Sequence, residues 1–157
     1  MKINLIHIAL AGASIVLVSL VGFTKTGDKR VPDQPFDSYG DLSWEDEKAH
    51  LDNFAIALQN DPGATGYIIV YAGRRSCVGE AKDRALRAKK YLVQTRAIEA
   101  SRIKSIDGGY REELAVILQP APRGAPELTA SPTLKRREVQ IMKNCKPKSP
   151  KPGKRSP

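Results

Sequence analysis

The chain has 157 residues, of which 41% are hydrophobic, and carries a formal net charge of +9. This length corresponds to one domain with tails. Because much of the apolar content lies in the first two dozen residues, the core must be built from roughly a hundred residues. The final twelve residues supply five of the nine positive charges and contain no acid. No aromatic side chain lies among those cations to stack on a base, so we expect no nucleic-acid partner.

Residues 1–24 have the composition of an export segment. Lys2 provides a short positive start, and the stretch from Ile3 to Phe23 is uncharged and almost entirely apolar. At about 1.5 Å per residue, a helix of this length reaches about 30 Å, the thickness of a bilayer core. A cleaved signal peptide and a retained N-terminal membrane anchor both stay open. Either interpretation predicts an exported protein of the periplasm or cell envelope.

A polar linker is expected over residues 25–35, followed by a short strand from Phe36 to Gly40 and a helix from Ser43 to about Asn60. Ser43 is a favourable N-cap, and the acidic residues 45–47 suit the positive start of a helix. Apolar residues then recur at helical spacing. These residues are Trp44, Leu51, Phe54, Ala55 and Leu58.

The continuous apolar run from Gly66 to Tyr71 predicts a buried central strand. After a loop over residues 72–79, a second helix is expected from Glu80 to about Thr95. One face of this helix consists of alanine and leucine side chains, and the other face is strongly cationic. The cationic residues are Lys82, Arg84, Arg87, Lys89 and Lys90.

Two further strands are predicted, from Ile103 to Asp107 and from Glu113 to Gln119. The short connection around Gly108 suits an antiparallel hairpin. The resulting order, βαβαββ, is that of a two-layer α/β sandwich with its helices on one sheet.

Residues 120–145 form a Pro-rich extension, with a candidate last strand from Glu138 to Met142. Residues 146–157 are basic and rich in Pro, Lys and Ser. Because this composition offers no apolar side chains to bury in a core, the tail is expected to be disordered.

The chain has two cysteines, Cys77 and Cys145. In an exported protein a lone pair of thiols is expected to close into a disulfide, and two free thiols are the alternative. Cys77 with His50 as its base would need a third group to orient the pair, and no motif supplies one. No Cys/His ligand spacing or phosphate-binding Gly motif occurs either. We therefore expect no enzyme activity, no metal and no cofactor.

Four arginines surround the predicted start of the second helix, namely Arg74, Arg75, Arg84 and Arg87. Because a helix N-terminus favours anions, these side chains are candidates for an anion-binding site. The alternative is a solvated cationic helix face without a ligand.

Three stretches within residues 36–119 carry a family resemblance when taken in order. They are residues 51–55 (Leu-Asp-Asn-Phe-Ala), Arg84-Ala85 followed by Tyr91-Leu92, and residues 101–103 (Ser-Arg-Ile) followed by Gly109-Tyr110. With the order of the elements, they resemble the OmpA C-terminal-like family of peptidoglycan-associated domains. The resemblance implies an OmpA-like α/β domain without catalytic activity.

Domains of that family hold the diaminopimelate of the peptidoglycan stem peptide. An Asp after the central strand takes the ammonium group, and a helix Arg takes a carboxylate, since a zwitterion needs one anion and one bidentate cation. Arg84 occupies the place of the family's Arg, whereas Arg74 or Gly73 falls on that of the acid. A cation there repels an ammonium group, so weak or absent binding of diaminopimelate in the family manner is expected.

The resemblance implies a non-catalytic cell-envelope protein whose ligand is peptidoglycan or another anionic envelope component. The alternative is a protein-interaction or scaffold module that binds envelope proteins and has lost peptidoglycan binding.

Overall fold

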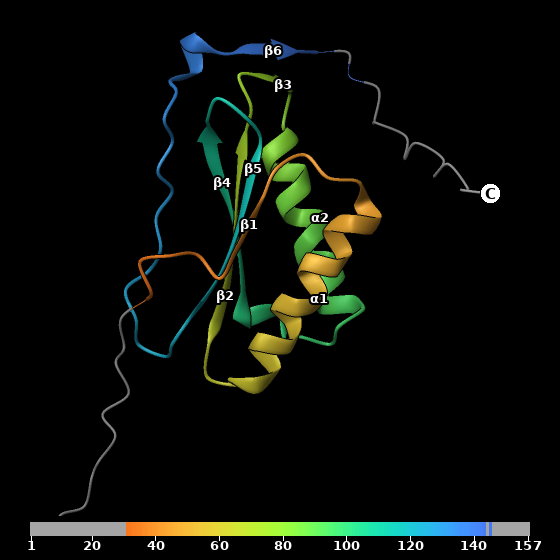
Figure 1. The fold of residues 1–157 in the computed structure, drawn as a ribbon, viewed down its shortest axis with the longest axis vertical. Coiled ribbons are helices and arrows are strands. Elements are labelled where there is room, and N and C mark those ends of the chain that lie inside the picture. The colour runs from red at the N-terminus through yellow and green to blue at the C-terminus, as the bar shows by residue number, and fades with distance from the viewer. Residues whose placement is uncertain (1–30, 144, 146–157) are drawn as a thin grey trace, which may run out of the picture.

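The computed structural model describes residues 31–143 and residue 145. The expected export segment 1–24 and basic tail 146–157 lie outside the described residues. Figure 1 shows two helices against one face of a sheet, with the C-terminal segment running along the other face. The strands are β1 (Asp37–Tyr39), β2 (Thr65–Ala72), β3 (Arg75–Cys77), β4 (Ile103–Tyr110), β5 (Ala115–Ala121) and β6 (Gln140–Met142). The helices are α1 (Trp44–Asn60) and α2 (Glu80–Gln94), with short 3-10 turns η1 (Ala100–Arg102) and η2 (Arg136–Glu138).

The main sheet is mixed and has the order β1-β5-β2-β4. Strand β2 pairs in parallel with β4 and antiparallel with β5, which also pairs antiparallel with β1. The prediction of a mixed α/β architecture with two helices is therefore confirmed. The predicted hairpin is wrong, because β2 lies between β4 and β5. The backbone of the connection bonds to the end of β2 instead, as the Arg111 amide donates to the Ala72 carbonyl at 2.9 Å.

Both helices begin and pack as their sequences predict. The Ser43 side chain accepts a hydrogen bond from the Asp46 amide at 3.2 Å and so caps α1. Both helices bury one apolar face against the sheet, and the three alanines of α2 allow a close approach to the strands. The buried helix residues are Leu51, Phe54, Ala55 and Leu58 from α1 and Ala81, Ala85, Ala88 and Leu92 from α2, packed on Ile68, Val70, Val116 and Leu118 of the sheet.

The opposite face of the sheet carries a second apolar cluster around Tyr67, Ile69 and Tyr71. Ala125, Leu128 and Ala130 of the Pro-rich extension pack against this cluster, so the extension serves as a third, irregular layer. Its backbone is tied to the sheet at Tyr71, whose hydroxyl accepts a hydrogen bond from the Ser131 amide at 2.9 Å. The Arg111 guanidinium lies 3.7 Å from the centre of the Tyr71 ring and donates to the Ser131 carbonyl at 3.2 Å.

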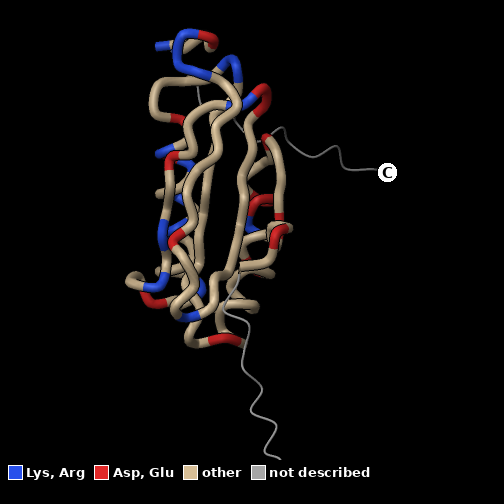
Figure 2. Tube along the Cα trace, turned by 90° about the vertical axis from the view of Figure 1, so that its left-hand side faces the viewer, with Lys and Arg blue, Asp and Glu red and all other residues tan. Residues whose placement is uncertain are grey.

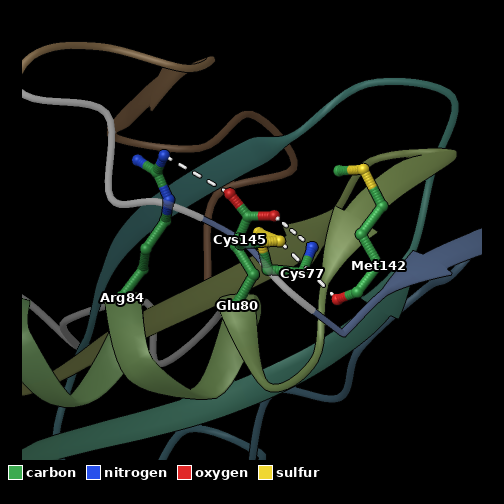
Figure 3. The surroundings of a disulfide bond; sticks show 5 residues. All are labelled: Cys77, Glu80, Arg84, Met142 and Cys145. Atoms are coloured by element: carbon green, nitrogen blue, oxygen red, sulfur yellow. Dashed lines mark hydrogen bonds and ion pairs between the residues drawn. A yellow bond between two sulfur atoms is a disulfide. The ribbon is translucent and has the colours of Figure 1, made fainter.

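The candidate last strand exists as β6, which pairs in parallel with β3 in a separate two-stranded sheet. The region expected to be a loop, residues 72–79, therefore contains a strand that needs this distant partner. The predicted disulfide between Cys77 and Cys145 is confirmed, with the two Cα atoms 5.8 Å apart. Figure 3 shows the bridge beside the first turn of α2.

Replacing both Cys77 and Cys145 by Ser is expected to lower the free energy of unfolding. The bridge spans 68 residues, and for a loop of this size the chain-entropy model assigns up to about 4 kcal/mol. Urea unfolding of the oxidised wild type and the double Ser variant measures the difference. Equal midpoints for the two proteins would contradict a stabilising role for the bridge.

Replacing Gly108 by Ala is expected to destabilise the domain by about 1–3 kcal/mol, because overpacking shifts well-packed neighbours. A Cβ atom at this position would lie 2.7 Å from the Tyr71 ring and 2.9 Å from the Val70 carbonyl oxygen. Gly40→Ala is the matched control, since its Cβ would meet only the Leu114 carbonyl oxygen at 3.5 Å. Thermal unfolding of both variants tests the prediction, and equal melting temperatures would count against it.

Candidate functional site

Arg74 lies in the short connection between β2 and β3 and is paired with an acidic side chain of the β4–β5 connection. Its Nε and Nη2 atoms donate to the two carboxylate oxygens of Glu112 at 2.7 and 2.6 Å. The hydrogen bonds from Arg74 hold the pKa of Glu112 below its usual value, and Glu112 in turn raises the pKa of Arg74. The guanidinium also donates to the Glu138 carbonyl at 3.3 Å. Arg74 therefore connects β2 to η2.

Arg84 lies in the second turn of α2, and only 15% of its side chain is exposed. Its Nη2 atom lies 2.6 Å from Asp41 Oδ1 and 3.5 Å from Glu80 Oε1. The other oxygen of Glu80 accepts a hydrogen bond from the Cys77 amide at 3.0 Å, as Figure 3 shows. A ligand carboxylate that used Arg84 would have to compete with two carboxylates of the protein itself.

Arg87, one turn further along α2, forms an ion pair with Glu47 and lies over the Trp44 ring at 4.5 Å from its centre. Only 1% of the Glu47 side chain is exposed. The Tyr39 hydroxyl donates to its other oxygen at 3.5 Å, and burial raises the pKa of Tyr39. Glu47 is therefore more than a helix-start charge, because it joins α1, α2 and β1 through buried contacts.

Arg75, on β3, is exposed like Arg74 and Arg87, but it differs from them because it forms no ion pair with any residue that the structure describes. The other three guanidinium groups each bind a different set of carboxylates within the protein. The described contacts thus do not gather the four arginines into one anion site. Three of them bind separate acids and hold elements of the fold together, and Arg75 has no such partner among the described residues.

A group of exposed cations that the sequence analysis did not single out surrounds β3 and β6. These side chains come from β3, from η2 and its N-terminal flank, and from the residue after β6. None of them forms an ion pair within residues 31–143 and 145, and Glu138 is the only acid between residues 135 and 143. Figure 2 shows the gathering of Lys and Arg at the upper end of the molecule. We call this group the cationic end, and its members are Arg75, Lys135, Arg136, Arg137 and Lys143.

The run Lys135-Arg136-Arg137 was the sequence signal for this surface. Its separation from Arg75 by 59 intervening residues hid the grouping, which arises only when β6 pairs with β3. In that pairing Arg75 lies opposite Gln140, two residues after Glu138.

The side chains considered for catalysis have other roles in the described structure. Cys77 is bonded to Cys145, and Nδ1 of His50 lies 2.7 Å from Asp37 Oδ2. Among the described residues, no group of three or more His, Cys, Asp or Glu side chains is placed to hold a metal ion. A shallow depression of about 530 Å³ opens beside β1, between Tyr39, Glu113 and Thr133.

Comparisons with known proteins add no relative to this description. No family model, no curated protein and no solved structure matches the chain. Within residues 31–143 and 145, none of the helices is long and apolar enough to cross a membrane.

The Arg87–Glu47 pair supplies a test of a structural role for one candidate arginine. Arg87→Met is expected to cost about 3 kcal/mol of unfolding free energy, because it leaves the Glu47 charge buried without its partner. The double variant Glu47→Gln/Arg87→Met should recover part of that loss, since it removes the buried charge as well. Urea unfolding of the wild type, the single variants Glu47→Gln and Arg87→Met, and the double variant forms a double-mutant cycle. Strictly additive effects would show that the two side chains are not coupled.

Proposed function

We propose that the chain is an exported, non-catalytic binding protein of the cell envelope that attaches to an anionic envelope component through its cationic end. The domain assignment rests on the resemblance of residues 36–119 to the OmpA C-terminal-like family. An order of β1, α1, β2, α2, β4 and β5 around one sheet, with both helices on one face, supports this assignment. Export rests on the composition of residues 1–24.

The observation that carries the proposal is the contrast between paired and unpaired cations. Arg74, Arg84 and Arg87 are neutralised by acids of the protein. The five side chains of the cationic end have no such partner among the described residues, so their positive potential extends into solvent, where it attracts anions. The sequence continues beyond Cys145 with five more cations and no acid. An anionic surface or polymer matches this distribution better than a single small molecule.

The contacts of Arg84 argue against the family's way of holding diaminopimelate. Asp41 and Glu80 take the guanidinium that would bind a ligand carboxylate. Near the place of the family's Asp, Arg74 offers a cation paired with Glu112. Peptidoglycan is therefore a candidate ligand as an anionic polymer. The contacts of Arg84 and Arg74 do not favour a pocket that holds its diaminopimelate.

A second candidate function is a protein-interaction module of the envelope that kept the fold and lost the ligand. The internal pairing of Arg84 favours it, because the residue that would have bound the ligand now joins α2 to the segment before α1.

The proposal predicts salt-sensitive binding of the full chain to isolated envelope fractions, with sacculi and membranes tested separately by co-sedimentation. Arg136→Ala/Arg137→Ala should weaken binding about tenfold, the equivalent of about 1.4 kcal/mol. The matched control is Lys90→Ala/Arg123→Ala, which removes the same charge from exposed sites outside the cationic end. Equal weakening by both pairs would point to net charge alone. If the protein binds neither sacculi nor membranes, the proposal is overturned and the protein-interaction module is favoured.

A further inference from the structure

Two exposed apolar side chains lie within the cationic end. Val78 follows β3 and is 62% exposed, and Met142, the last residue of β6, is 37% exposed. The two residues are neighbours, because the Val78 amide donates to the Met142 carbonyl at 3.2 Å. Lys143 follows Met142 directly, and Arg75 lies on the strand that pairs with β6. The surface therefore has two exposed apolar residues at one end of the β3–β6 pairing, with Lys143 directly after them and the other cations towards the opposite end of the two strands.

This combination distinguishes among anionic partners. A nucleic acid or an anionic glycan would use the cations but would leave Val78 and Met142 in water. At a lipid surface, apolar side chains enter the region between headgroups and acyl chains, while Lys and Arg bind the phosphates of anionic lipids. We propose that the cationic end docks on an anionic phospholipid bilayer, with Val78 and Met142 entering the interface. This inference rests on the proposed function and names the component that the cationic end binds.

The structure presents this surface in a fixed arrangement. Strands β3 and β6 are paired from Arg75 and Gln140 to Cys77 and Met142, and the Cys77–Cys145 bridge closes the end of that pairing, as Figure 3 shows. The Gln140 amide also donates to the Arg74 carbonyl at 2.8 Å. Because the two strands are held together before binding, docking needs little further ordering of the backbone.

The geometry also brings two weak membrane signals together at one place. The strength of binding to a membrane interface depends on the apolar area that is buried and on the attraction of cations to anionic lipids, so the two contributions reinforce each other at one place. Each basic residue near an anionic surface contributes about fivefold in affinity, the equivalent of about 1 kcal/mol. The basic sequence after Cys145 continues from this same end of the fold.

The test uses the full chain with its disulfide intact, titrated with vesicles of phosphatidylcholine alone or mixed with phosphatidylglycerol. The apolar N-terminal segment is common to every variant and both vesicle types. The wild type is therefore judged by the ratio of its two partition coefficients, and each variant by its partition into anionic vesicles relative to the wild type. The wild type should prefer the anionic vesicles, and salt should reduce that preference. Val78→Ser/Met142→Ser should weaken partition into anionic vesicles about tenfold, the equivalent of about 1.4 kcal/mol. Ile56→Ser/Leu86→Ser, at exposed apolar sites on the two helices, should leave it unchanged.

The outcomes separate this inference from the proposed function. Equal partition of the wild type into neutral and anionic vesicles overturns the inference, as does equal behaviour of the two Ser pairs. If the protein binds sacculi or nucleic acid but does not prefer anionic vesicles, the cations bind a polymer and the bilayer inference is wrong. Binding to sacculi in that case still supports the proposed function. No binding to vesicles, sacculi or membranes discards both.

Discussion

The burial of β2 is the constraint on which the rest of the structure depends. All residues of this strand after Thr65 are buried, and both of its edges are paired, with β4 on one side and β5 on the other. A strand of this kind needs an apolar cover on each face. The two helices provide one cover, and the Pro-rich extension, packed against Tyr67 and Tyr71, provides the other. The extension is therefore an integral part of the fold.

The sequence predicts those elements whose signals are local. The Ser43 cap and the apolar spacing identify α1, and the unbroken run before Tyr71 identifies β2, because these patterns lie within one element. Partners far apart in the chain leave no such pattern. The four residues between β4 and β5 suit a hairpin in length, yet the demand of β2 for two neighbours decides the order. Ala125, Leu128 and Ala130 follow no periodicity, so their packing is not predictable from spacing.

The candidate site shows the same contrast between local signals, which the sequence reveals, and distant partners, which it does not. The arginines near the start of α2 are visible in the sequence, but apart from Glu80 their acids come from other parts of the chain. The pairing of Arg84 with Asp41 or of Arg87 with Glu47 therefore needs the fold. Since opposite charges in partly buried places neutralise each other, cations that lack such partners dominate the outer potential. A count of charges along the chain therefore directs attention to α2, whereas the fold brings unpaired cations together at η2, β3 and β6, where we propose the binding surface.

The Cys77–Cys145 bridge also makes the covalently closed fold depend on oxidation of two thiols. Cys145 follows the segment whose residues Ala125, Leu128 and Ala130 cover the outer face of the sheet, so its bond to Cys77 anchors the C-terminal end of that cover. In a reducing compartment these thiols stay open, and the pairing of β6 with β3 then lacks its covalent closure. If the chain is exported as we propose, the covalently closed form would arise only in the oxidising compartment, which would then act as a checkpoint for assembly of the proposed binding surface.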